Sequence, residues 1–267
     1  LGGSLGVDAI EEFSVITSNY EADYGKTSGG VVNAITRSGT NQIHGSAYEF
    51  LRNSKLDAKN YFDDPSLPIP PFKRNQFGGT IGGPIVKDHT FFFADYEAIR
   101  QSKGITTVAT VPSAAARGGT LCSNPDVPPP NNCTPTTVTV DPAAQSYFTF
   151  YHLPNQGPVA GSNGDLGIFT FAGQQVVNEN FFTGRVDHKF SMNDSLFGTY
   201  MYDKTPYSSP DGLNNVEFTT VTARQFLAIE ETHIFTPKFA NSIRIGGNHE
   251  AVDNNKSLKA INPDAAN

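Results

Sequence analysis

The feature that most constrains this chain is a series of segments whose side chains alternate in character with a period of two. The clearest covers residues 182–190, where Thr183, Arg185, Asp187 and Lys189 alternate with mostly apolar residues. This alternation is typical of a β-strand, because successive side chains of a strand point to opposite faces of the sheet. The sequence therefore predicts an all-β chain whose strands have one polar face and one largely apolar face.

The connections between these segments alternate between short and long. The expected strands are residues 43–52, 75–85, 90–100, 182–190, 196–202, 224–235 and 243–251, with short turns near 86–89, 191–195 and 236–240 and long loops near 53–74, 112–174 and 204–221. A β-sandwich, the alternative architecture, does not sort its turns by side. Short turns at one end and long loops at the other are typical of an antiparallel transmembrane barrel.

The segment before these strands reads IEEFSVITSNYEADYGKTSGGVVNAITR, residues 10–37. Its first part alternates as a short strand does, and Gly25, Gly29 and Gly30 flank an apolar stretch. Glycine permits positive φ and close backbone approach. We therefore expect a tight, buried β-hairpin here.

IEEFSV followed by YGKTSGGVVNAITR is similar to the C-terminal end of the plug in TonB-dependent outer-membrane receptors. SGTNQIHGSAYEFLRNSKLDAKNYFD and PPFKRNQFGGTIGGPIVKDHTFFFADYEAIR resemble the Oar-like branch of that family. The matching motif residues in the hairpin are Tyr24, Gly25, Gly29, Gly30, Asn33 and Arg37. The resemblance covers residues 10–100, and the rest of the chain agrees only in its general strand pattern.

The resemblance implies a domain division. Residues 1–38 would be the C-terminal part of a plug, and residues 39–267 the N-terminal part of the barrel, with about seven of roughly 22 strands. A receptor of this family would carry a coupling motif and most of its plug before Ile10, so the chain is interpreted as a fragment.

Facing can be assigned for several strand residues. We expect Tyr48 and Phe50 to face lipid and Glu49 to face the lumen. Glu97, Arg185 and Asp187 are also lumen candidates, and Arg37 lies where the plug would end. Each of these is interpreted as a structural contact between plug and barrel more readily than as a ligand of a solute.

The two cysteines, Cys122 and Cys133, flank the segment SNPDVPPPNN within the longest loop. A disulfide closing this loop fits an oxidising compartment, and a pair of free thiols is the alternative. A metal site is disfavoured because no further Cys or His stands at zinc-finger spacing.

Charge and motifs argue against several other functions. The net charge is −7, without a long basic cluster, which disfavours nucleic-acid binding. Gly25-Lys26-Thr27 lacks the earlier glycine of a phosphate-binding loop, and no catalytic constellation is recognisable. Four histidines are dispersed along the sequence and form no recognisable ligand set: His44, His89, His188 and His233. We expect no enzyme activity, no metal and no cofactor.

The resemblance implies energised uptake of a scarce solute across the outer membrane, with an oligosaccharide-like or peptide-like cargo suggested by kinship. Its partners would be a TonB-type energy-transducing protein, contacted through parts of the receptor that are missing here, and outer-membrane lipid. A function from another class is a secreted or surface-exposed adhesive β-domain that binds through the Cys122–Cys133 loop.

Overall fold

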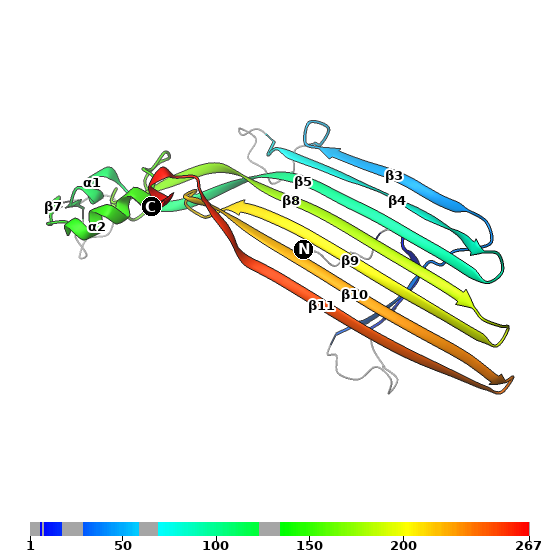
Figure 1. Ribbon diagram of the computed structural model, residues 1–267. Helices are drawn as coiled ribbons and strands as arrows, with labels where there is room; N and C mark the ends of the chain where they lie inside the picture. Colours follow the sequence, from blue (N-terminus) through cyan, green and yellow to red (C-terminus); the bar gives the residue numbers. More distant parts are fainter. Residues whose placement is uncertain (1–5, 7, 18–28, 59–68, 123–133, 267) are drawn as a thin grey trace.

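The computed structural model describes residues 6, 8–17, 29–58, 69–122 and 134–266. These residues form a large curved sheet, a separate hairpin on its concave side, and an arm at one end (Figure 1). In the described part of the chain, no helix is both long enough and apolar enough to cross a membrane.

The large sheet is an antiparallel meander of seven strands in the order β11-β10-β9-β8-β5-β4-β3. Its strands are β3 (His44–Asn53), β4 (Phe72–Val86), β5 (Thr90–Pro112), β8 (Leu166–Lys189), β9 (Asp194–Pro210), β10 (Val216–Thr236) and β11 (Phe239–Ala260). The described strands leave β3 and β11 as open edges, so the sheet is a partial barrel. The predicted all-β, antiparallel architecture is confirmed.

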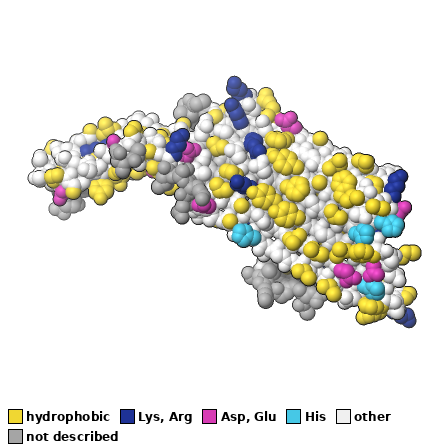
Figure 2. Space-filling model, viewed as in Figure 1, with side chains coloured by type: hydrophobic (Ala, Val, Ile, Leu, Met, Phe, Trp, Pro, Cys, Tyr) yellow, Lys and Arg dark blue, Asp and Glu magenta, His cyan; other side chains and the backbone are white. Residues whose placement is uncertain are grey.

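The two faces of this sheet differ because side chains alternate along each strand. The inner face is the one that carries Ser46, Asp95 and Arg185, which lie toward the hairpin and the residues before it. The outer face carries exposed apolar side chains, among them Ile81, Val186, Ile229 and Ile245. Figure 2 shows these apolar side chains gathered over the outer face.

Tight turns connect the strands at the end of the sheet away from the arm. The turn between β4 and β5 places Asp88 at φ 66°, in the left-handed region that Asp tolerates better than most residues. Asn41 holds this turn, since its Nδ2 donates to Asp88 Oδ1 at 2.6 Å and its Oδ1 accepts from Asp88 N at 2.8 Å. The short turns near 86–89, 191–195 and 236–240 fall where the sequence indicates.

The predicted loop at 204–221 is wrong. Strand β9 continues to Pro210 and β10 begins at Val216, so the connection is residues 211–215. Pro206 misled the sequence interpretation because proline lacks the N–H of a ladder. Pairing of β9 with β8 is interrupted between Lys204 and Tyr207, while pairing with β10 continues there. The strand therefore accommodates the proline.

The predicted loop at 112–174 is partly wrong. Strands β5 and β8 pair out to Pro112 and Leu166, so residues 166–174 are strand. The arm beyond them holds several short elements rather than a structureless stretch. They are α1 (Ala114–Arg117), β6 (Thr120–Leu121), β7 (Thr136–Thr137), α2 (Pro142–Tyr147) and η1 (Phe148–Phe150). A further 3-10 helix, η2 (Pro263–Ala266), lies at the C-terminal end.

Arg117 organises the arm from within. Its guanidinium donates to the carbonyl oxygens of Pro112, Phe148 and His152, the last at 2.5 Å. Burial lowers the pKa of Arg117 from its ordinary value. Asn215 and Asn262 then connect the arm to the other strands, because their Nδ2 atoms donate to the carbonyl oxygens of Phe150 and Thr149.

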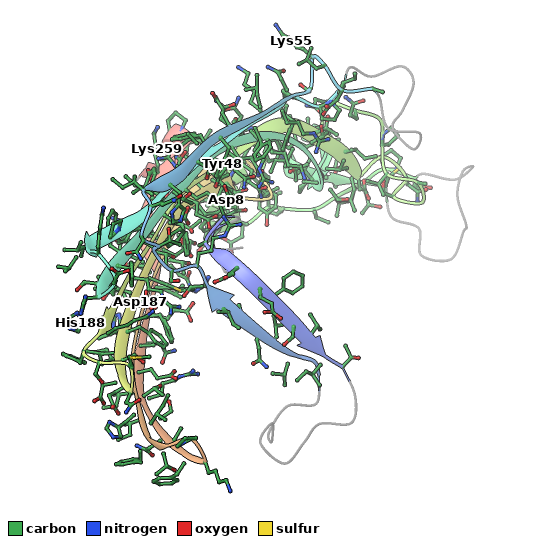
Figure 3. The ribbon with its side chains drawn as sticks, turned by 90° about the vertical axis from the view of Figure 1, so that its right-hand side faces the viewer. Asp8, Tyr48, Lys55, Asp187, His188 and Lys259 are labelled. Atoms are coloured by element: carbon green, nitrogen blue, oxygen red, sulfur yellow. The ribbon has the colours of Figure 1, made fainter. Side chains whose placement is uncertain are left out.

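The hairpin pairs β1 (Ile10–Ile16) with β2 (Val31–Thr36), as the sequence predicts. The expectation that it is buried is wrong for the described residues. The side chains of Phe13, Val15 and Val32 are 66%, 53% and 63% exposed. Figure 3 shows the reason: the hairpin projects from the concave side of the sheet, with only its base near the strands.

The glycines of β4 show how close contact depends on the absence of a Cβ. A Cβ built on Gly78 would lie 2.5 Å from Tyr96 O and 2.7 Å from Tyr48 Oη. The ring of Tyr48 therefore covers Gly78 and crosses β4 toward β5. An aromatic ring over a strand glycine restores the packing that the glycine lacks.

We predict that Gly78→Val lowers barrel stability by about 1–3 kcal/mol, because the new side chain displaces the Tyr48 ring. The measurement is the temperature at which the folded band of the purified full-length protein disappears in an electrophoretic heat-shift assay. Gly247→Val is the matched control, since a Cβ on this strand glycine meets no atom within 4 Å. Equal melting of the two variants would contradict the assigned role of Gly78.

Candidate functional site: the contact between the hairpin and the inner face

Arg185 connects the sheet to the hairpin. Its Nη1 donates to both the carbonyl oxygen and Oγ1 of Thr36, each at 3.0 Å. Its Nη2 lies 2.7 Å from Asp187 Oδ1, and its Nε also donates to that carboxylate. The Phe197 ring lies 4.3 Å below the guanidinium carbon. With its side chain only 13% exposed, Arg185 is held on three sides while it reaches the last residue of β2.

The strand periodicity explains why Arg185 and Asp187 meet. Residues two apart on a strand share a face, so the carboxylate lies beside the guanidinium on the inner face. The sequence grouped both as lumen candidates, and the structure brings them together at Thr36. A cavity of about 210 Å³ adjoins this contact, lined by residues of β2, β8, β9, β10 and β11, including Ala34, Met201 and Arg244.

Glu97 lies on the same inner face, 3% exposed, in a hydrogen-bonded row that crosses three strands. Tyr48 Oη donates to Glu97 Oε2 at 2.8 Å, and Gln76 Nε2 donates to Glu97 Oε1 at 2.8 Å. Arg74 Nη2 donates in turn to Gln76 Oε1 at 3.0 Å. Both carboxylate oxygens of this buried acid are thus satisfied, as burial of a charge requires.

The facing predicted for β3 is wrong. Tyr48 contacts Glu97 on the inner face, so Phe50 shares that face and Glu49 lies on the outer face, exposed. The alternation in β3 is ambiguous because aromatic or apolar residues occur at both parities. Only the register, which places Tyr48 opposite Gly78, decides which side meets Glu97.

Asp95 is the inner-face group that sequence reasoning did not single out as a site residue. It is 1% exposed, and neither carboxylate oxygen has a hydrogen-bond partner among the described residues. Gly6 lies directly against it, since a Cβ there would be 2.1 Å from Asp95 Oδ2. Nearby, Ser46 Oγ donates to Asp8 Oδ2 at 2.8 Å. The residues before the hairpin therefore contact the inner face of the sheet at acidic and hydroxyl groups.

The hairpin motif residues contribute mainly to the hairpin itself. Arg37 donates from its backbone N to Ala9 O at 2.9 Å and from Nε to Ile10 O at 3.3 Å. Asn33 pairs with Ser14 in the ladder. Gly29 and Gly30 are not among the described glycines with positive φ, and a Cβ on Gly30 would lie 3.4 Å from the carbonyl oxygen of Ile16 on the neighbouring strand. Tyr24 and Gly25 lie outside the described residues.

Cys122 is disulfide-bonded, and it is 9% exposed in the arm. Its backbone N donates to Asp165 Oδ1 at 2.7 Å, and its carbonyl accepts from Asn163 Nδ2 at 3.1 Å. Cys133, the other cysteine of the sequence, lies outside the described residues.

A group of potential metal ligands lies at the short-turn end. Atoms of Asp194, Glu231 and His233 lie within 4.8 Å of one another, and His233 Nδ1 is 2.5 Å from Asp194 Oδ1. The sequence treated His233 as dispersed because Asp194 is far away along the chain, and the β9–β10 register brings them together. The three side chains are half-buried and already hydrogen-bonded in part to one another.

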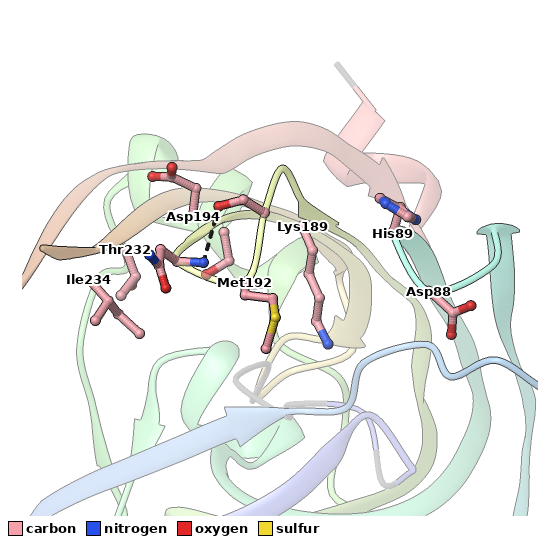
Figure 4. A pocket seen from close by; sticks show the side chains of 10 residues that line it. Asp88, His89, Lys189, Met192, Asp194, Thr232 and Ile234 are labelled. Atoms are coloured by element: carbon pink, nitrogen blue, oxygen red, sulfur yellow. Dashed lines mark hydrogen bonds between the residues drawn. The ribbon is translucent and has the colours of Figure 1, made fainter. Parts of the chain in front are cut away.

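An open cavity of about 610 Å³ lies at the same end. It is bordered by the β4–β5 turn with Asp88 and His89, by Lys189 and the β8–β9 turn, and by Thr232 of β10 (Figure 4). Met192 at its rim is 99% exposed. Its lining mixes one ammonium group with carboxylates, so it presents no single sign of charge to a ligand.

Comparison with known proteins identifies the family. A family model described as an outer membrane beta barrel domain matches residues 35–267. The TonB-dependent transporter Oar of Myxococcus xanthus is 34% identical over 97 residues, which are 34% of this chain and 9% of that protein. The chain thus spans a small part of the length of this curated relative. No solved structure matches.

The matched model covers most of the chain, including all seven strands of the large sheet. The similarity to Oar agrees with the resemblance read from the plug-like and Oar-like motifs. The chain therefore belongs to the outer membrane beta barrel domain family, is located in the outer membrane, and resembles an Oar-like TonB-dependent receptor over the region they share.

Proposed function

We propose that the chain is part of an energised outer-membrane transporter, in which the β1–β2 hairpin is the end of a plug and the sheet is the start of the surrounding barrel. The observation that carries this proposal is the contact of Arg185 with Thr36. An arginine on the barrel wall that binds the base of the hairpin couples the position of the hairpin to the wall.

The chemistry of the inner face suits a plug that seals and yet can move. Hydrogen bonds are directional, and water can replace both hydrogen bonds and ion pairs when the groups separate. Besides Arg185, the wall carries Arg244 paired with Glu230, and Arg224 within 2.9 Å of Glu250. A polar wall of this kind also gives a hydrophilic solute a path without a large desolvation cost.

The long connections and the arm would lie outside the cell, and the short turns in the periplasm, as in other barrels of this type. The transported solute would be a scarce hydrophilic molecule, and the energy-transducing partner would be a TonB-type protein that acts on the plug. The named relative is a TonB-dependent transporter, which supports this choice over an adhesive domain or an enzyme.

The first expected outcome concerns the complete protein. We predict recovery in the outer-membrane fraction, extraction only by detergent, and a folded band that changes mobility on heating, because a closed barrel resists unfolding by the gel detergent. Fractionation and gel electrophoresis with and without boiling make the measurement. A soluble product with one mobility would contradict the proposal and favour the adhesive domain.

The second expected outcome concerns Arg185→Gln. The substitution removes charge-assisted hydrogen bonds to Thr36 and leaves Asp187 unpaired, at a cost of about 1.5–3 kcal/mol per charged contact. Protease cleavage within the hairpin of the purified full-length receptor should become roughly tenfold faster or more.

Arg244→Gln is the matched control, because this arginine lines the same cavity beside the hairpin but its hydrogen bond goes to Glu230 of the sheet. Its hairpin should be cut at the wild-type rate. If Arg185→Gln and Arg244→Gln were cleaved equally, the hairpin would not depend on Arg185.

A further inference from the structure

A basic depression lies on the outer face, near the end of β3 and β4 that leads toward the long connections. We define it by the side chains of Lys73, Asn75, Arg100, Ser102 and Asn178, and its volume is about 410 Å³. The alternation of the strands places all five on the outer face, on β4, β5 and β8. They are cross-strand neighbours, since Lys73 pairs with Ser102, and Arg100 pairs with both Asn75 and Asn178.

The polar groups of the depression have donor capacity that the protein does not use. Arg100 Nη1 donates to Ile99 O and Glu179 O, and Nη2 donates to Asn180 Oδ1 at 2.6 Å. A guanidinium has five N–H donors, so Nε–H and one Nη2–H remain. Within the described part of the chain, no hydrogen bond or ion pair is recorded for the ammonium of Lys73 or the side-chain amides of Asn75 and Asn178.

Other charges near the depression do not cancel this excess of donors. Arg52 lies at its rim but is paired with Asp57 at 3.1 Å. Glu49 lies on the outer face of the edge strand β3, where it pairs with Phe77. It is the outward-facing residue next to Leu51 on that strand. Among the described residues, Lys73 and Arg100 thus face the depression without a carboxylate partner, and Glu49 is the neighbouring acid on the outer face.

Directly below the depression the outer face becomes apolar. Toward the short turns, the next outward-facing residue is Phe77, which is 37% exposed. Tyr96 and Phe182 follow as a cross-strand pair, 42% and 39% exposed, and Ile81 comes after them at 49%. Tyr96 Oη and Arg100 Nη2 both donate to Asn180 Oδ1, which joins the aromatic level to the basic level. Figure 2 shows Lys and Arg side chains in a line beside the apolar patch.

We propose that the basic depression binds the phosphate-bearing headgroup of a lipid in the outer leaflet of the outer membrane, whose acyl chains lie along the apolar outer face below. A phosphate is an acceptor-only anion, and it matches a site of ammonium, guanidinium and amide donors. An apolar surface continuous with the site favours a lipid over a soluble anion. The inference goes beyond the proposed transport and rests only on its membrane orientation.

The test uses the purified full-length receptor in neutral maltoside micelles, with bound lipid counted by native mass spectrometry. The probes are bis-phosphorylated lipid A, the same glycolipid without phosphates, and inorganic phosphate alone. We expect retention of the phosphorylated lipid and at least fivefold weaker retention of the dephosphorylated one. Each surface cation near an anionic headgroup contributes enough that Lys73→Gln should weaken retention by about fivefold.

Arg100→Gln should weaken retention by a similar factor, but it also removes contacts to Glu179 and Asn180. Lys73→Gln therefore carries the test, because the Lys73 ammonium has no hydrogen bond or ion pair to lose among the described residues. Lys87→Gln is the matched control: it removes the same charge from an exposed position at the opposite end of β4, and retention should be unchanged.

Three results would overturn the proposal: equal retention of both glycolipids, wild-type retention by Lys73→Gln, or saturation of the site by inorganic phosphate with no preference for the lipid. The last result would assign the depression to a soluble anion. Heat-shifted migration of every variant shows whether the barrel is formed. A failure of lipid binding is thus distinguished from a failure of the membrane-barrel assignment.

Discussion

The backbone ladder between β5 and β8 is the interaction on which the rest of the structure depends. It runs from Thr90 opposite His188 to Pro112 opposite Leu166. It joins β3, β4 and β5 to the four strands from β8 to β11, although the arm separates these two groups along the chain. The entropic cost of closing a long loop grows only slowly with the length of the loop. A long continuous ladder of backbone hydrogen bonds can therefore offset the cost of closing the arm. Without this pairing, β3–β4–β5 and β8–β11 would be two unconnected meanders.

The same ladder sets the chemistry of both faces. It places Asp95 opposite Thr183, Phe93 opposite Arg185, and Glu97 opposite Phe181 on the inner face. On the outer face it places Tyr96 opposite Phe182 and Arg100 opposite Asn178. Because a shift of one residue exchanges the faces of a strand, the polar inner wall, the apolar outer surface and the basic depression all require this one register.

The inner and outer faces of the sheet carry different side chains because they have different surroundings. On the inner face, acids such as Glu97 are buried, and neighbouring side chains satisfy their hydrogen-bonding capacity. On the outer face, large apolar side chains remain exposed, which would be unfavourable in water and is favourable against lipid. Asp95 is one exception on the inner face, together with Thr183 and Thr199, since its carboxylate is buried without a hydrogen-bond partner in the described residues. Its position against Gly6 ties this exception to the segment that precedes the hairpin.

Sequence alone determined that the chain is all-β, where most strands lie, and which residues of β8 share the polar face, because period-two alternation is a local property. The motif between residues 10 and 37 likewise indicated the hairpin and the receptor family. Tertiary pairing decided what local patterns leave open. It kept Pro206 within a strand, because β10 supplied the ladder that β8 lacked there.

Pairing also turned Tyr48 inward and Glu49 outward, because only the register with Gly78 and Glu97 distinguishes two ambiguous faces. It brought His233 to Asp194, and Arg100 to Asn75 and Asn178, across distances in sequence that no spacing rule covers. The sequence by itself thus determined the kind of structure and its local elements. The identity of the residues that meet was decided by the tertiary structure, because cross-strand neighbours follow from register, which many distant backbone hydrogen bonds set together.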